Sequence, residues 1–456
     1  MTRREKLFGA GALLAALASL HGLGGAVLLY PGLLVWALRG RSGSGRVGAA
    51  GLWGVLFAAF FYHWVGAYGV LPWLALSAVR GLPWLLFPLP GLALERWAGG
   101  SEGEGRRGLG WLDVLGACLG LGLVSAALLL GITGVDWETP AGALTAWPHL
   151  LAPLPWVGLA GVAGGLGLLS ALLLSGRTRP TGIGVVLLSL WIAAAPRPEG
   201  REVSLPKVAL VQTGFSQNEK WDERYREKSM EALLQRTAEA AEKGAELVIW
   251  PETAWPYRGM RRRVTNTRRI GKAARRLQVD LLASSIEEEP GTPEWRNSVS
   301  LVQTSGRFTQ QYEKRRLAPF AEYIPLPRPL SDPLRRVPPF SRISQFVPGE
   351  GSTVFLTSSG KRFAVLICYE SMTPGMAAEL APEVDFLVVV TNDAPFASAQ
   401  ANEAHFRSAV MRAVETGKPV LQAANTGVTG AVDGNGGVIV RTPPGFSGPT
   451  VQYIRP

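Results

Sequence analysis

The chain has 456 residues and a formal net charge of +11, and 47% of its residues are hydrophobic. Two cysteines exclude a disulfide scaffold, and the four scattered histidines form no Cys/His cluster with the spacing of a metal site. No zinc-finger or RNA-binding signature accompanies the basic balance, so the charge alone does not indicate a nucleic-acid-binding protein.

The first part of the chain, residues 1–197, has the composition of a membrane protein, rich in Leu, Ala, Gly, Val and Trp and poor in charge. About 20 apolar residues span a bilayer as a helix. The apolar runs therefore predict about seven transmembrane helices, at 7–21, 24–38, 47–69, 72–94, 110–131, 150–175 and 181–196. Cys118 falls inside one of these runs, and we expect it to pack within the membrane.

Basic residues are concentrated at the amino terminus and in alternate loops between these helices. They are Arg3, Arg4, Lys6, Arg39, Arg41, Arg46, Arg96, Arg106, Arg107, Arg177 and Arg179. The positive-inside rule then predicts a cytoplasmic amino terminus and places everything after the seventh helix on the other side of the membrane. Arg80 is the exception, because it lies within the 72–94 run. We expect it either at the level of the lipid head groups or facing a polar cavity.

From Lys207 onward, short apolar strands alternate with helices. The strands are expected at 207–212, 246–252, 279–286, 296–307, 308–314, 362–370, 384–393, 419–427 and 429–440, with 296–307 and 308–314 paired. The helices are expected at 222–243, 262–277 and 402–417. This alternation predicts an α/β domain with helices covering a sheet. The proline-rich stretch 324–350 is predicted to be a long surface loop.

Three short segments of this α/β part carry side chains suited to acyl transfer. WPET places Glu252 at the carboxyl end of a buried strand, YEKRRLAPFAEYIP carries Lys314 and Glu322, and VLICYES places Cys368 where a strand gives way to a turn. Catalytic groups of α/β sheets gather at such strand ends. A thiol becomes a nucleophile only beside a base or a cation. Glu252 is suited to take its proton, and Lys314 to stabilise an oxyanion.

Each of these residues has a simpler explanation when it is considered alone. A single buried cysteine is usually inert packing. A glutamate after a strand is often a cap or a surface charge, and a lysine beside two arginines is often solvated. The presence of all three residue types at strand ends favours the catalytic interpretation. Glu322 would then either hold Lys314, since a buried ammonium requires a partner, or relay protons.

This combination resembles the nitrilase, or carbon–nitrogen hydrolase, superfamily, and more narrowly the apolipoprotein N-acyltransferase family. The matching segments include VALVQTGFSQNEKWDE, LVIWPETAWP, YEKRRLAPFAEYIPL, ICYES, TNDAPF, HFRSAVMRAVETGKPVLQAANTG and TGAVDGNG. The resemblance implies a multi-domain protein in which a transmembrane helical bundle, 1–197, precedes an extracytoplasmic α-β-β-α sandwich, 205–442. Residues 443–456 are then expected to form a C-terminal tail.

The same resemblance implies roles for individual residues. Glu252 would be the base, Lys314 the electrostatic stabiliser and Cys368 the nucleophile. Supporting positions are matched by Glu322, Tyr369 and Glu370, and substrate-binding loop positions by Trp221 and Phe396.

The sequence departs from the family pattern at three points. Ala321 stands where glycine is usual, and Pro395 stands where tryptophan is usual. No apolar segment long enough to span a membrane follows the α/β part before Pro456. These differences concern the contacts of an acyl chain or lid and the anchoring of the domain.

The function implied by the resemblance is that of an N-acyltransferase of the bacterial inner membrane, with its catalytic domain on the periplasmic side. An acyl group would pass from a membrane phospholipid to Cys368 as a thioester, and then to the amino-terminal diacylglyceryl-cysteine of an apolipoprotein. The other expected contacts are membrane lipids. We expect no cofactor, no metal, no nucleic acid and a monomeric protein.

Two alternatives remain open. A membrane-tethered nitrilase-type amidase or hydrolase would use water as the second nucleophile. A pseudoenzyme would bind lipids or partners without catalysis.

Overall fold

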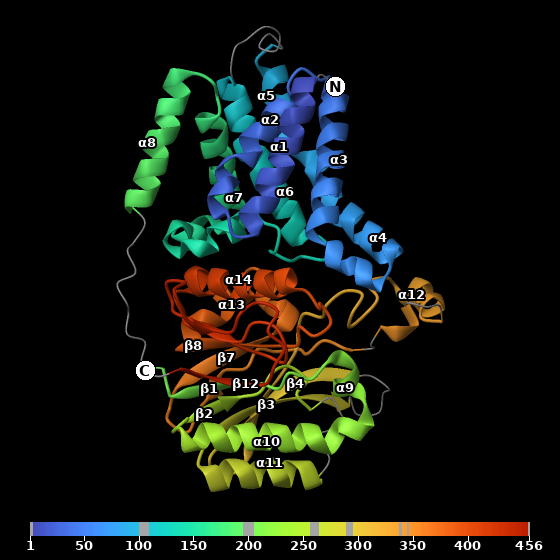
Figure 1. Ribbon diagram of the computed structural model, residues 1–456, viewed down its shortest axis with the longest axis vertical. Helices are drawn as coiled ribbons and strands as arrows, with labels where there is room; N and C mark the ends of the chain where they lie inside the picture. Colours follow the sequence, from blue (N-terminus) through green and yellow to red (C-terminus); the bar gives the residue numbers. More distant parts are fainter. Residues whose placement is uncertain are drawn as a thin grey trace. The chain divides into compact units, whose positions relative to one another are not determined.

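The computed structural model describes residues 3–99, 109–194, 205–255, 264–288, 295–336, 340–343 and 346–454. The chain divides into two compact units, Met1–Glu199 and Gly200–Pro456. The first unit is helical and the second is an α/β structure (Figure 1). The multi-domain fold class predicted from the sequence is therefore confirmed.

Eight α-helices, connected in part by short 3-10 turns, make up the described part of the first unit. They are α1 (Arg3–Leu20), α2 (Tyr30–Leu38), α3 (Gly43–Phe61), α4 (Val70–Gly81), α5 (Leu89–Trp97), α6 (Trp111–Leu130), α7 (Leu154–Leu173) and α8 (Thr178–Ala194). Four stretches are long and apolar enough to cross a membrane, namely Gly43–Phe61, Val70–Trp97, Trp111–Leu130 and Leu154–Leu173. This unit is a membrane domain, and the number of its crossings stays a prediction.

Arg80 on α4, the charged residue within the predicted 72–94 helix, is buried inside the first unit. Only 2% of its surface is exposed. Its Nε donates to Oε1 of Glu138, and its terminal nitrogens donate to the carbonyls of Leu128 and Val135 at 3.0 and 2.9 Å. Tyr62 donates its hydroxyl to the other Glu138 oxygen at 2.6 Å. Arg80 therefore lies in a buried polar cluster, and its depth relative to the head groups stays a prediction.

Replacing Arg80 by Met is expected to destabilise the first unit by about 3–5 kcal/mol, because Glu138 would keep its charge inside the protein without its cation. The measurement is thermal unfolding of the full chain in detergent. Arg46→Met is the matched control, since the Arg46–Glu95 pair at 2.6 Å is only partly buried and should contribute less than about 1 kcal/mol. Equal shifts for both variants would contradict the importance of the buried pair.

The second unit contains two six-stranded sheets, with strand orders β12-β1-β2-β3-β4-β5 and β11-β10-β9-β8-β7-β6. The first comprises β1 (Val208–Gln212), β2 (Leu247–Ile249), β3 (Asp280–Glu288), β4 (Trp295–Val302), β5 (Phe308–Glu313) and β12 (Thr450–Ile454). The second comprises β6 (Phe355–Leu356), β7 (Arg362–Ile367), β8 (Phe386–Thr391), β9 (Val420–Ala424), β10 (Gly430–Val432) and β11 (Val438–Arg441). Strands β1–β3 are parallel, as are β7–β9, and the predicted pairing of β4 with β5 is confirmed.

Four layers result from the packing of helices on the outer faces of the two sheets (Figure 1). The first sheet is covered by α10 (Arg226–Glu242) and α11 (Val264–Leu277), and the second by α13 (Met376–Leu380) and α14 (Ala399–Thr416). An apolar core, with Leu210, Ile249, Val365 and Val388, lies between the sheets. The central strands are buried on both faces, which explains why they read as continuous apolar runs rather than as alternating patterns. The α-β-β-α sandwich is confirmed.

Several short elements differ from the sequence predictions. The predicted tail 443–456 includes β12, which pairs antiparallel with β1, and the stretch predicted as one strand at 429–440 forms the hairpin of β10 and β11. The predicted loop 324–350 contains α12 (Arg328–Leu334), while 337–339 and 344–345 lie outside the described residues, as do 262–263 of the predicted basic helix. A further helix, α9 (Gln217–Trp221), had no prediction. Elements this short carry too little periodicity to be read from sequence.

Candidate active site

Cys368 lies where β7 ends and a short 3-10 helix, Cys368–Met372, begins. Its φ of 49° is in the left-handed region, which is costly for a residue with a side chain and persists where the surroundings hold it. Two contacts hold this turn: Ser371 Oγ donates to the Cys368 carbonyl at 2.8 Å, and the Ile367 N–H donates to Oε2 of Glu370 at 2.8 Å. The thiol is therefore presented on a strained, well-supported turn.

Glu252 follows β2 and receives hydrogen bonds from both sheets. Its Oε1 accepts from Asn297 Nδ2 on β4 at 2.7 Å, and its Oε2 accepts from the backbone N–H of Asn392, just after β8, at 2.9 Å. The next residue, Thr253, has a φ of 43°, which is an outlier for a β-branched side chain. The carboxylate is 6% exposed and has a fixed orientation.

Lys314 follows β5 and is 1% exposed. Its Nζ lies 2.8 Å from Oε2 of Glu322 and 3.4 Å from Oε1 of Glu252. Burial lowers the pKa of this amine, but the two carboxylates outweigh burial and hold the pKa above its usual value. Lys314 is therefore a permanent cation, and Glu322 is the partner expected for it.

The thiol of Cys368 is held in its neutral form. Desolvation and the negative charge of Glu252 raise its pKa well above the ordinary value, while Lys314 and a hydrogen bond from Thr391 act in the opposite direction. The residue still keeps partial solvent exposure. A neutral thiol requires a base to become a nucleophile, and Glu252 and Lys314 both lie close enough to act on this thiol electrostatically.

Glu370 is fully buried and joins two parts of the site. Its Oε1 accepts from the Tyr312 hydroxyl at 2.8 Å and from the backbone N–H groups of Arg315 and Arg316 at 2.7 and 3.0 Å. Its Oε2 accepts from Ile367. Burial raises the pKa of Glu370, and the backbone hydrogen bonds oppose that rise. The residue thus ties the loop after β5 to the turn that carries the thiol.

The remaining predicted residues are more peripheral. Tyr369 is buried beside the thiol turn. Phe396 is partly exposed, and its ring meets that of His405 edge to face with 6.4 Å between centroids. Trp221 ends α9 and is 45% exposed. The structure therefore brings together Glu252, Lys314, Glu322, Glu370 and Cys368, while substrate binding by Trp221 and Phe396 stays a prediction.

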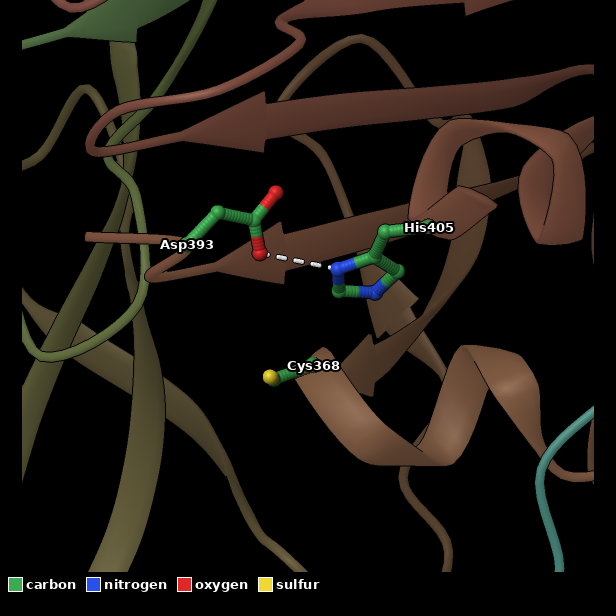
Figure 2. Close-up of side chains that lie close together, drawn as sticks. All are labelled: Cys368, Asp393 and His405. Carbon is green, nitrogen blue, oxygen red and sulfur yellow. Dashed lines mark hydrogen bonds and ion pairs between the residues drawn. The ribbon is translucent and has the colours of Figure 1, made fainter. Parts of the chain in front are cut away.

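Figure 2 shows a second group beside the thiol, in which Cys368, Asp393 and His405 approach one another from separate elements. Their potential ligand atoms all lie within 4.8 Å of one another. However, His405 Nδ1 bonds to Asp393 Oδ1 at 2.8 Å and its Nε2 bonds to Ser371 Oγ at 3.0 Å. Both ring nitrogens already have protein partners, so this donor set does not fit a metal ion.

The His405–Asp393 pair instead forms a buried support for the thiol turn. Burial lowers the pKa of His405, but the charge and hydrogen bond of Asp393, with the backbone of Cys368 and the charge of Glu252, outweigh burial, and the net shift is upward. The negative charge of Asp393 is also one of the causes that raise the pKa of Cys368. Sequence reasoning missed this pair because a histidine inside an amphipathic helix gives no sign of its partners.

Sequence reasoning also missed a network of amides between the sheets. Asn425, after β9, donates to Asn392 Oδ1 at 2.9 Å and to the carbonyl of Phe215 at 2.8 Å. Asn392 Nδ2 donates to Gln217 on α9 at 3.0 Å. These bonds fix α9 beside the carboxylate of Glu252.

Comparison with known proteins agrees with the motifs and with the fold. The carbon–nitrogen hydrolase family matches residues 207–446. An apolipoprotein N-acyltransferase of Azotobacter vinelandii is 32% identical over 344 residues, which cover 72% of this chain and 55% of that protein. The enzyme of the same name from Rhizobium etli is 28% identical over 440 residues, which cover 85% of this chain and 78% of that protein.

Among solved structures, Saccharomyces cerevisiae Nit3, a member of branch 10 of the nitrilase superfamily, is similar at 19% identity and a TM-score of 0.43. The match covers 55% of this chain and 90% of that one. The chain spans about half the length of the first curated relatives that it matches, with 55% of the Azotobacter protein and 36% of a Brucella suis relative covered.

Proposed function

This chain belongs to the carbon–nitrogen hydrolase family, and from that premise we propose that it is a membrane-bound N-acyltransferase. The reaction would move a fatty acyl group from a phospholipid to the amino-terminal diacylglyceryl-cysteine of an apolipoprotein. The observation that carries this proposal is the thiol of Cys368 beside the buried pair of Glu252 and Lys314, in a chain that also contains a membrane domain.

In the first half-reaction, Glu252 takes the thiol proton and the Cys368 sulfur attacks an ester carbonyl of the phospholipid. The carbonyl oxygen becomes negatively charged, and the fixed cation of Lys314 stabilises it. Collapse breaks the ester C–O bond. The lysophospholipid oxygen takes the proton back from Glu252, and the acyl group remains on sulfur as a thioester.

In the second half-reaction, the α-amine of the acceptor cysteine gives a proton to Glu252 and attacks the thioester carbonyl. Lys314 stabilises the second oxyanion. The C–S bond breaks as the amide forms, and Glu252 returns the proton to the Cys368 thiolate. One carboxylate thus acts as base and then as acid in each half-reaction, which suits a group held by two hydrogen bonds in one orientation.

Lipid substrates are supported by the first unit. Four apolar stretches long enough to span a bilayer accompany the catalytic fold, and a soluble amidase for small substrates has no use for them. The alternation of basic loops supports an inner-membrane protein with its second unit in the periplasm. Both substrates would then lie in the leaflet that faces the site.

The thioester itself tests this function. Incubation of the purified full chain with a diacyl phospholipid, without acceptor, should add the mass of one fatty acyl group to Cys368, and hydroxylamine should remove it. Intact-protein mass spectrometry reads both steps. An adduct that forms only with short amides, and never with phospholipid, would instead favour the membrane-tethered hydrolase and contradict acyl transfer.

A further inference from the structure

A second lysine, Lys220 on α9, contacts Glu252 and has no part in the mechanism above. It is 4% exposed, although lysines are seldom buried without a paired charge. Its Nζ donates to the backbone carbonyl of Glu252 at 2.8 Å. A buried ammonium held by the carbonyl of the proposed base calls for an explanation beyond packing.

The charge of Lys220 is coupled to the reacting groups. Burial lowers its pKa to about 7, while negative charge on Glu252 and on Cys368 raises it. Such an interaction is mutual, so a positive Lys220 favours the thiolate as the thiolate favours a positive Lys220. Lys314 is the other cation of the site, 3.4 Å from the Glu252 carboxylate. On α9 itself, Glu219 bonds to Ser216 in the helix cap.

The hydrogen bond of Lys220 also falls at a strained point of the backbone. The residue after the accepted carbonyl is Thr253, with its φ of 43°. A strained backbone conformation persists only where the surrounding contacts hold it in place. The amide network that ends at Gln217 fixes α9 from the other side, so Lys220 can act on the Glu252 turn from a rigid support.

We propose that Lys220 is a positioning residue of this site, whose Nζ fixes the backbone of Glu252 and whose positive charge promotes ionisation of Cys368. The inference rests on the proposed function in assigning Cys368 as the nucleophile and Glu252 as its base. It adds a second lysine to the site, which contacts the backbone carbonyl of Glu252, whereas Lys314 lies near the carboxylate. The hydrogen bond and the charge are separable by substitution.

The test uses the full chain with Cys118→Ala, so that Cys368 is the single thiol. Lys220→Gln keeps a hydrogen-bond donor without the charge, and Lys220→Met removes both. Lys228→Met, at an exposed position on α10, is the matched control for the loss of one lysine. The readout is the rate of Cys368 alkylation by iodoacetamide as a function of pH, measured by intact mass.

Below about pH 7, where Lys220 carries its charge, both Lys220 variants should react about tenfold more slowly than the parent, since one pKa unit corresponds to a factor of ten. At higher pH, where Lys220 of the parent is also neutral, the profiles should converge. The Lys228 variant should follow the parent. If Lys220→Gln has the same pH profile as the parent, Lys220 acts only through its hydrogen bond, and the proposed role of its charge is refuted. Because Gln preserves the donor, this comparison holds even if the Met variant folds poorly.

Alkylation requires no lipid, so the two proposals can fail separately. A shifted alkylation profile in a protein that forms no acyl thioester would support the role of Lys220 and refute the acyltransferase. Unshifted profiles in a protein that does form the thioester would refute the role of Lys220 alone.

Discussion

Cys368→Ala should abolish acyl transfer, with a loss on the order of 10⁴-fold or more, because removal of a covalent nucleophile leaves no route to the thioester. The fold should persist, since Ala accepts the same turn at similar cost and the hydrogen bonds from Ser371 and Ile367 involve no part of the sulfur. The measurement is mass spectrometry of lipoprotein amino termini from cells that depend on this protein.

Cys118→Ala is the matched control, because it removes the other thiol of the chain, which lies on α6 in the first unit. That variant should retain transfer. Undiminished N-acylation of lipoproteins by Cys368→Ala would refute the thioester mechanism.

Glu252→Gln should lower acyl transfer by about 10²–10⁴-fold, the usual contribution of a general base. The same substitution should accelerate alkylation of Cys368 by iodoacetamide. The carboxylate raises the pKa of the thiol, so its removal lowers that pKa and the thiolate forms at lower pH. Transfer and thiol reactivity are thus expected to change in opposite directions.

The control for this experiment is Glu379→Gln, which removes an exposed carboxylate paired with Arg315. It should change neither quantity. A fall in both transfer and alkylation for Glu252→Gln would indicate that Glu252 serves the shape of the site rather than proton transfer.

The positions of Glu252, Lys314 and Cys368 could be predicted from the sequence because each stands at the end of a predicted strand. WPET, VLICYES and the end of the 308–314 strand place these residues at the ends of β2, β7 and β5, which belong to two different sheets. The buried strands themselves were predictable for the same reason, since apolar β-branched runs have few other uses.

Beyond Glu322, Tyr369 and Glu370, the residues that support the buried polar sites could not be predicted, because their significance depends on partners far along the chain. Asn297 reads as an ordinary polar residue in a strand until β4 places it against both Glu252 and Glu322. Lys220 reads as part of a charged helix start until it reaches the Glu252 carbonyl. Arg80 reads as a misfit in an apolar helix, since its partner Glu138 lies far along the chain. Hydrogen bonds between such distant residues produce no periodic pattern in the sequence.

The pairing of β12 with β1 means that the first sheet is completed by a segment synthesised long after the strand it joins. Residues 208–212 leave the ribosome long before residues 450–454, and chains generally fold from the amino terminus as they emerge. Until the last strand arrives, β1 presents an open edge, and the segment that leads from it to α9 lacks a finished sheet behind it. The first sheet, which carries Glu252 after β2 and Lys314 after β5, is therefore complete only once residues 450–454 have paired with β1.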